Sequence, residues 1–524
     1  MKNFIFERKK LIPVITVALF FAILVITGCL IYKDYGISSD EPIDYTRGQV
    51  NYTAFRGGSL EDYNTACAKL KNVCFYPPLY SMVTYRLVLE GDSQIIYERL
   101  HLINFLFFAG AVFVFFLIGK KIFKNWIIAL LGCLFLVLSP RIFGHAFYNP
   151  KDIPFMDAYI VTIYTMLLFL EKKNIFTAIL HGIAIAVACA IRTPGLIIPP
   201  ITFAFYFFDL FLAKSSWKDY RKGLTLLILS GIVTSLLVYW FTPFLYGDPI
   251  ANFILTFNLM RKYSWNQSQL YLGVDIRNKI PWHYSLVWFS ISSPPFYVSL
   301  FGLGSVTLII RSLKARLREH FRALRDLYLV GACAVLPIAA VIVMKSVIYS
   351  DNRQMYFCYP ALLLISLYGF KFLIEELRKI NQHWQAWSSV ILILGLAYPF
   401  YFMVHYHTRE DVFFNFLAGP RLSVIATRFT MDRWGLAGKD ALEYILATDP
   451  DPHIQIAATS GIVQSLKILP KSQRERLKIK DMGPAEFYIT HSLNEPGNIV
   501  HGNLVFTVKV FDADIIRVYR DDGK

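Results

Sequence analysis

Long apolar runs alternate with short polar segments through the first 405 residues of the chain. A membrane-spanning helix needs about 20 predominantly apolar residues. About eleven runs have this character, near residues 11–32, 101–119, 126–143, 154–170, 175–191, 195–213, 223–245, 284–310, 327–348, 354–374 and 387–405. The pattern predicts a polytopic α-helical membrane protein. Pro199-Pro200 and Pro294-Pro295 interrupt two runs, and a membrane bundle tolerates them where neighbouring helices satisfy the freed backbone groups.

Lysine and arginine residues gather in every second gap between these runs. The basic segments are residues 2–10, 120–124, 172–173, 214–222, 311–325 and 371–379. Because cytoplasmic loops carry an excess of basic residues, the N-terminus is predicted to lie in the cytoplasm. The long loop 33–100 and the tail 406–524 then lie on the opposite side of the membrane.

The tail changes character after the last apolar run. Residues 440–446 have the pattern of a helix. Residues 454–458, 486–490, 504–508 and 515–519 have the pattern of strands, the last two joined by a turn near Asp512. We therefore expect two domains: a transmembrane domain of residues 1–405, which includes the first outer loop 33–100, and a small α/β extracytoplasmic domain of residues 406–524.

Composition supports lipid as the main solvent. The chain is 55% hydrophobic and 17% charged, whereas soluble proteins have about 25% charged residues. A net charge of +16 would suit nucleic acid, but the charge follows the membrane loops, so no nucleic-acid partner is expected. The seven cysteines contain no CxxC pair. Cys67 and Cys74 share the outer loop, where either a disulfide or two free thiols are consistent with the sequence.

An acidic pair, Asp40-Glu41, follows the first apolar run within the stretch Ser38-Ser39-Asp40-Glu41-Pro42. One interpretation is structural: Ser39 or Asp40 caps a helix that Pro42 helps to begin. The other interpretation is chemical, because two carboxylates at the lipid surface are placed to handle a proton. Local pattern alone leaves both open.

A second acid and several cations fall at the same predicted membrane face. Lys151 and Asp152 lie between Pro150 and Pro154, where a helix-terminal turn is the structural alternative. Arg192 and Arg353 also lie on this face, where the orientation rule does not account for them. Ionisable residues near a membrane suggest function, and the arginine fork suits phosphate. The structural alternative is an arginine that snorkels to the interface or one that pairs with Asp351. His145, close by, is interpreted as an ordinary interfacial histidine.

These charges fit a reaction of a lipid-linked phosphate donor. Cations would hold the departing phosphate, and a carboxylate would take the proton of an acceptor hydroxyl. A transporter would instead place charges and broken helices at the midplane of the bilayer. The centres of the predicted helices here are nearly free of charge.

The order of these elements resembles the C-fold membrane glycosyltransferases, and glycosyltransferase family 39 in particular, with its protein O-mannosyltransferases and aminoarabinose transferases. The resemblance rests on Ser39-Asp40-Glu41-Pro42, Tyr76-Pro77-Pro78-Leu79-Tyr80, Ser139-Pro140-Arg141 and Asn149-Pro150-Lys151-Asp152-Ile153-Pro154. It covers residues 1–200 well and the remainder chiefly in topology. The tail is not similar to the sugar-binding repeats of eukaryotic mannosyltransferases.

The resemblance implies an inverting hexosyl- or pentosyltransferase that uses a polyprenyl-phosphate sugar. It assigns Asp40 as the catalytic base, Glu41 as the residue that orients it, and Asp152 as a ligand of the acceptor across the cavity. The candidates for the donor are Lys151, Arg192, Arg353 and, more weakly, Arg47 for the phosphate, with Tyr76 and Tyr80 stacking on the sugar. Glu41 and Asp152 are also the candidate ligands if a divalent metal takes part, a requirement that the sequence leaves open.

Three functions remain to be compared: a glycosyltransferase, a flippase or carrier of lipid-linked sugar without covalent chemistry, and an assembly or sensor protein that works through its tail. The membrane expected for the enzyme is a bacterial inner membrane. The sequence does not indicate the sugar, and it leaves open whether the acceptor is a protein, a lipid or a glycan.

Overall fold

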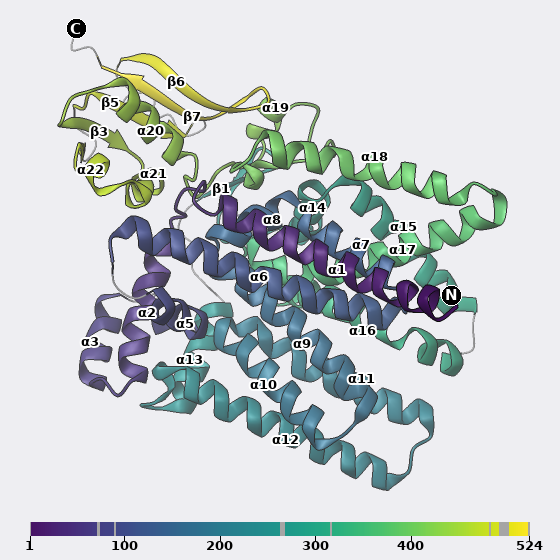
Figure 1. Ribbon diagram of the computed structural model, residues 1–524. Coiled ribbons are helices and arrows are strands. Elements are labelled where there is room, and N and C mark those ends of the chain that lie inside the picture. Colours follow the sequence, from purple (N-terminus) through teal and green to yellow (C-terminus); the bar gives the residue numbers. More distant parts are fainter. Residues whose placement is uncertain are drawn as a thin grey trace.

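The computed structural model of the protein describes residues 2–70, 74–88, 91–261, 268–314, 317–349, 351–480, 484–491 and 502–521. A bundle of long helices forms most of the molecule, and a small sheet domain lies at one end of it (Figure 1). The N-terminus lies at the opposite end of the bundle. The short helices of the first loop lie at the same end as the sheet domain.

The helices of the bundle are α1 (Lys2–Ile31), α6 (Ser93–Phe123), α7 (Trp126–Val137), α8 (Pro140–Tyr148), α9 (Asp152–Lys172), α10 (Ile175–Ile191), α11 (Ile198–Ala213), α12 (Trp217–Phe241), α14 (Tyr284–Ser292), α15 (Pro295–Lys314), α16 (Leu317–Val343), α17 (Tyr359–Ile380) and α18 (Trp384–His405). Short 3₁₀ turns precede α11 and α17, namely η1 (Thr193–Ile197) and η3 (Arg353–Cys358). A further 3₁₀ turn, η2 (Pro243–Leu245), leads from α12 into α13 (Pro249–Arg261) and the hairpin of β1 (Gln269–Tyr271) and β2 (Val274–Ile276).

The prediction of a polytopic helical membrane protein with a small α/β domain is confirmed. Within the described residues, nine helices are long and apolar enough to cross a membrane, or ten if the bent pair α7–α8 is counted as one span. The helix α10 is also apolar but has 17 residues. The predicted number of eleven is therefore not confirmed, and the difference lies in the short helix α10 and in the bent pair α7–α8.

Two predicted spans are broken, each at a residue that precedes a proline. The run 126–143 bends by 67° between α7 and α8. Ser139, before Pro140, has extended backbone angles, φ −94° and ψ 99°. The run 284–310 divides into α14 and α15 at Ser293, which precedes Pro294 and has φ −98° and ψ 151°. Proline disfavours helical angles in the residue before it, and this explains both breaks.

The bend between α7 and α8 places α8 inside the protein rather than along a membrane axis. All nine residues of α8 are buried. Arg141, His145 and Tyr148 of this helix are therefore buried side chains. The break is therefore part of what positions polar side chains in the interior.

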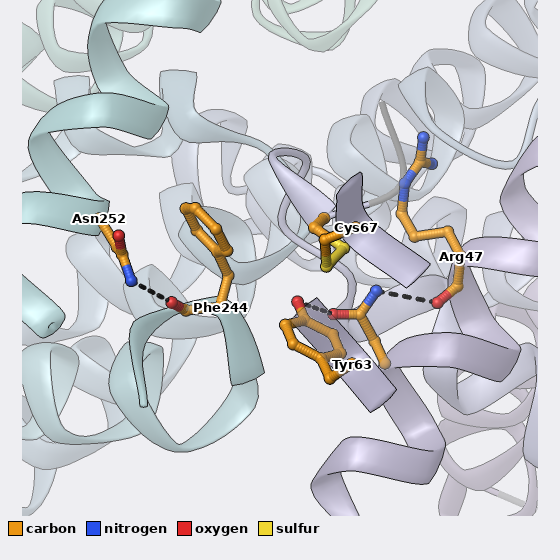
Figure 2. The surroundings of a disulfide bond; sticks show 7 residues. Arg47, Tyr63, Cys67, Phe244 and Asn252 are labelled. Carbon is orange, nitrogen blue, oxygen red and sulfur yellow. Dashed lines mark hydrogen bonds between the residues drawn. A yellow bond between two sulfur atoms is a disulfide. The ribbon is translucent and has the colours of Figure 1, made fainter. Parts of the chain in front are cut away.

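The first loop folds into three helices, α2 (Glu41–Phe55), α3 (Leu60–Lys69) and α5 (Leu79–Val88). A disulfide joins Cys67 and Cys74, whose Cα atoms lie 5.6 Å apart (Figure 2). Of the two states that the sequence allows for these cysteines, the structure has the bonded one. Cys74 packs with Ala54 of α2 and Tyr63 of α3, so the bridge closes a small apolar cluster of its own.

The tail forms a five-stranded sheet in the order β4-β3-β5-β7-β6. Its strands are β3 (Ile454–Ala458), β4 (Leu477–Ile479), β5 (Phe487–His491), β6 (Asn503–Val510) and β7 (Ala513–Arg520). Short helices flank the sheet: α19 (Leu422–Ala426), α20 (Gly438–Thr448), α21 (Ser460–Gln464) and α22 (Lys471–Arg474). The predicted helix and four strands are present, and the sequence pattern missed β4, which has three residues.

The sheet domain is docked on the first loop and the start of α6. Arg474 lies 2.9 Å from the Asp92 carboxylate, and Ser93 donates a hydrogen bond to the carbonyl of Lys467. The ammonium of Lys439 donates to the carbonyl of Lys33 at 2.8 Å. These contacts hold the tail over the end of the bundle where α2 and α9 begin.

Candidate functional site

Asp40 directly precedes α2, but its side chain does not cap that helix. Asp40 is the N-cap residue and makes no capping hydrogen bond. One carboxylate oxygen, Oδ2, lies 2.9 Å from Nη1 of Arg353 and 3.7 Å from Nζ of Lys151. The structural interpretation is therefore right about the position of Asp40 and wrong about its side chain, which faces two cations.

Asp152 contacts the same guanidinium as Asp40. Nη1 of Arg353 donates to Oδ2 of Asp152 at 2.8 Å, and Arg192 forms an ion pair with Oδ1. The side-chain amide of Asn149 donates to Oδ2 at 3.1 Å, while its oxygen accepts from the backbone N–H of Asp152. The Asn149 side chain thus accepts a backbone hydrogen bond at the start of α9. The Asp152 carboxylate is not needed for that purpose and contacts the two arginines.

A third carboxylate, Asp44, completes the group, and sequence reasoning missed it. Asp44 lies 3.1 Å from Nζ of Lys151 and forms an ion pair with Arg47. The ring of Tyr76 packs against Arg47 and Lys151, 4.9 Å and 5.4 Å from its centroid. The available signal was spacing, because residues four apart on a helix share a face, so Asp44 lies beside Asp40.

Burial and charge set the protonation of this group. Burial by itself raises the pKa of Asp40, but the cations Lys151 and Arg353 outweigh it and hold the pKa of that carboxyl below its usual range. Burial lowers the pKa of Lys151 to about 7, although Asp40 opposes the shift. Asp40 is therefore ionised at neutral pH, and Lys151 is poised between its two forms.

We call Asp40, Asp44, Asp152, Arg47, Lys151, Arg192 and Arg353 the charge cluster. Its ion pairs join Arg353 to Asp40 and Asp152, Arg192 to Asp152, Lys151 to Asp40 and Asp44, and Arg47 to Asp44. With Lys151 protonated, this set has four cations and three carboxylates, a balance of +1. The negative charge of an anion such as a phosphate would offset this net positive charge.

Three predicted site residues are not members of the charge cluster: Tyr76 packs against it, and Glu41 and Tyr80 have their partners elsewhere. Oε2 of Glu41 accepts from the backbone N–H of Ser38 at 2.6 Å, and Oε1 lies 2.8 Å from Nε2 of His101. Tyr80 donates from its hydroxyl to Asn104 at 2.7 Å, and its side chain is buried. Glu41 thus holds the turn before Asp40, and Tyr80 packs α5 on α6.

Aromatic rings lie beside Arg353, and one of them comes from the tail. The ring of Trp434 lies 4.7 Å from the guanidinium carbon of Arg353. The same indole contacts His145 and Tyr148 of α8, with centroids 5.1 Å and 5.8 Å away. Nothing in the sequence pattern indicates that residue 434 reaches residue 353, so sequence reasoning missed Trp434.

Among the residues that the structure describes, no group of three or more histidine, cysteine, aspartate or glutamate side chains is arranged to hold a metal ion. The two candidate ligands, Glu41 and Asp152, are engaged with His101 and with arginines respectively. The chemistry offered by the charge cluster itself is anion binding by its cations and proton acceptance by its carboxylates.

Comparisons with known proteins support the fold. No protein-family model matches the chain, and no curated protein does. ArnT from Cupriavidus metallidurans, solved with undecaprenyl phosphate, is similar over 96% of this chain and 97% of its own, with a TM-score of 0.50 and 12% identity. The archaeal oligosaccharyltransferase AglB from Archaeoglobus fulgidus, solved with an inhibitory peptide and dolichol-phosphate, is similar over 90% of this chain and 69% of its own, with a TM-score of 0.51 and 11% identity. The chain has the C-type fold of these membrane glycosyltransferases.

Proposed function

We propose that the protein is an inverting glycosyltransferase that moves a sugar from a polyprenyl-phosphate donor to an acceptor hydroxyl at the membrane surface. The observation that carries the proposal is the bridge of Asp40 and Asp152 through Arg353, with Lys151 and Arg192 beside them. Carboxylates and phosphate-binding cations meet there at one end of a membrane bundle. The fold shared with ArnT and AglB supports the same class of reaction.

The cations bind the donor phosphate in this proposal. Lys151, Arg192 and Arg353 come from the starts of α9, η1 and η3, so three separate segments would each supply a cation to the phosphate. Phosphate would compete with Asp40 and Asp152 for these cations, and charge-assisted hydrogen bonds to phosphate are strong. The neighbours were solved with undecaprenyl phosphate and dolichol-phosphate, which supports a lipid-phosphate donor for this chain as well.

Asp40 acts as the base. When the phosphate draws Arg353 and Lys151 toward itself, the pKa of Asp40 rises toward its ordinary value, and the carboxylate becomes a better proton acceptor. The acceptor oxygen then forms its bond to the anomeric carbon, the bond from that carbon to the phosphate oxygen breaks, and the acceptor proton passes to Asp40. The polyprenyl phosphate leaves with the bonding electron pair, held by the cations.

The remaining site residues position these groups. Asp152 binds the acceptor across from Asp40, and Glu41 acts through the turn at Ser38 that orients Asp40. Tyr76 lies beside Arg47 and Lys151, where a sugar ring would stack on it, and Arg47 is the weaker contact to phosphate. Tyr80 is assigned only a supporting part, because its hydroxyl is engaged with Asn104.

We place the site on the non-cytosolic face of a bacterial inner membrane. The basic gaps of the sequence support a cytoplasmic N-terminus. The described structure is that of an integral membrane protein, with the first loop and the sheet domain at one end of the bundle. Residues 1–405 then form the catalytic membrane domain, and residues 406–524 form an extracytoplasmic domain that covers the site.

Substitution of Asp40 by asparagine tests the proposal. General-base catalysis contributes about 10²- to 10⁴-fold, so Asp40→Asn should lower transfer of labelled sugar by at least about 100-fold. Asp44→Asn is the matched control, because it removes the same charge from the charge cluster one helical turn away and leaves the base in place. Both variants should accumulate in the membrane like the wild type. Equal loss in the two variants would contradict the assignment of Asp40.

A flippase or carrier would give a different result. Vesicles containing the protein and a labelled lipid-linked sugar would then show translocation of the label with no covalent product, in the wild type and in Asp40→Asn alike. Mass analysis of surface glycans and lipids, with and without the intact protein, would identify both the sugar and the acceptor.

A further inference from the structure

A groove of about 880 Å³ lies where the tail meets the bundle, between α15 and α18. Its walls are Phe296 of α15, Leu394 and Phe402 of α18, the segment 414–425 and the β6–β7 turn at Phe511. Both helices are long and apolar enough to cross a membrane. The volume falls in the range of about 300–1,000 Å³ for small-molecule sites. We call this groove the α15–α18 groove.

Exposed apolar residues mark the edge of the groove as a membrane surface. Phe416 is 71% exposed and Leu417 is 52% exposed, and Leu394 inside the groove is 70% exposed. Aromatic and apolar side chains at the end of a spanning helix are typical of the boundary between headgroups and acyl chains. The occupant of the α15–α18 groove is therefore a component of the membrane.

Two side chains of opposite charge lie at one end of the groove, where the segment after α18 meets the β6–β7 turn. Arg421 and Asp512 both line it, and both are exposed. Asp512 is held in place by Ser423, whose backbone N–H and hydroxyl donate to it at 3.2 Å and 2.5 Å. A ligand with one anionic and one cationic group matches this pair, whereas a ligand with only negative charge would be repelled by Asp512.

We propose that the α15–α18 groove binds a membrane phospholipid whose headgroup carries a primary amine. An acyl chain lies between α15 and α18, the phosphate contacts Arg421, and the ammonium donates to Asp512. Because the groove is lined by the bundle and by the turn of the tail hairpin, the lipid joins the sheet domain to the membrane domain. This inference does not rest on the transfer reaction.

Native mass spectrometry of the full chain tests the proposal, with phosphatidylethanolamine, phosphatidylcholine and phosphatidylglycerol supplied at equal concentrations. The wild type should retain phosphatidylethanolamine preferentially. Arg421→Gln should lower retention of all three lipids, and Asp512→Asn should lower that of phosphatidylethanolamine alone, each by about three- to tenfold. Lys172→Gln, at the exposed end of α9, is the control and should match the wild type.

A third variant tests the position of the acyl chain. Leu394→Trp would fill the α15–α18 groove from the exposed face of α18 and should lower retention of all three lipids, with no change in their order. Equal retention of the three lipids by the wild type would overturn the proposal. It would also be overturned if Asp512→Asn kept the preference for phosphatidylethanolamine, or if Leu394→Trp retained lipid like the wild type.

Discussion

Lys151 belongs to the charge cluster, and its charge changes near neutral pH. It is largely buried, with 15% of its side chain exposed, and burial lowers its pKa to about 7. An arginine at the same place would stay protonated, because its pKa exceeds about 12. The use of lysine at this position therefore makes the charge of the site depend on pH.

We expect the KM for the donor to rise with pH above about 7. Lys151 is charged below its pKa and neutral above it, so donor binding above this pH requires the uptake of a proton. The expected slope is at most about tenfold in KM per pH unit, since one proton is taken up. The measurement is donor KM between pH 6 and 9, with acceptor in excess.

Lys151→Arg is the matched variant for this measurement. Its charge does not change between pH 6 and 9, so its donor KM should be flat over that range. If wild type and variant show the same pH profile, another group controls donor binding, and the assignment of Lys151 to the phosphate is wrong.

At the scale of elements, α2 connects the charge cluster to the disulfide. Asp40, Asp44 and Arg47 recur at intervals of three to four residues, so one face of the helix carries them. One turn further on, Asn51 donates to the carbonyl of Arg47 at 2.9 Å and accepts from the hydroxyl of Tyr63 at 3.0 Å. Figure 2 shows this chain of contacts running from Arg47 toward Cys67.

The disulfide should support activity as well as stability. Replacing both cysteines, in Cys67→Ser/Cys74→Ser, removes a cross-link that closes a short loop, which costs about 2–3 kcal/mol of local stability. Tyr76 follows Cys74 by two residues and packs against Arg47 and Lys151, so the donor KM should rise while membrane accumulation stays unchanged. The measurement is donor KM with and without a thiol reductant.

Reductant should raise the donor KM of the wild type to the level of the double variant and leave the double variant unaffected. Cys29→Ser is the control, because Cys29 is exposed on α1 and forms no disulfide. An unchanged KM in the double variant would show that the bridge serves only the folding of the loop.

Folding of the whole molecule brings distant segments of the chain to one place. The first loop supplies Asp40, the start of α9 supplies Asp152, the start of η3 supplies Arg353, and the tail supplies Trp434. Trp434 is 7% exposed and packs on Arg353 and on α8. The tail thus contributes a wall to the charge cluster.

Trp434→Ala should lower transfer activity without preventing insertion. A cation–π contact contributes about 0.5–2 kcal/mol, which corresponds to a loss of about 2- to 30-fold. Trp434→Phe keeps an aromatic face and should retain more activity than Trp434→Ala. The measurement is kcat/KM for the donor in purified protein.

Trp384→Ala provides the matched control. Trp384 packs against Arg378 at 5.9 Å, at the junction of α17 and α18, which is the opposite end of α17 from η3 and Arg353. The same type of contact is removed there, and activity should be unchanged. If both alanine variants lose the same activity, the effect of Trp434 is on overall stability and not on Arg353.

The presence of the bundle helices, and the change from helices to strands in the tail, were predictable from the sequence. Apolar runs of about 20 residues can satisfy their backbone in lipid only as helices, so the runs identified the bundle. Alternation identified the tail strands except β4, because three residues are too few to show a period. The helix breaks at Ser139 and Ser293 were not predicted, although each residue precedes a proline and so carries the local cause.

By itself, the sequence determined the helical bundle, the sheet domain and the types of residue available for chemistry, because hydrophobic periodicity and charge are local properties of the chain. Only the tertiary structure decided that Asp40 and Asp152 share Arg353, that Glu41 pairs with His101, and that Trp434 reaches the site. These are contacts between segments far apart in the chain, and packing of the whole bundle selects them.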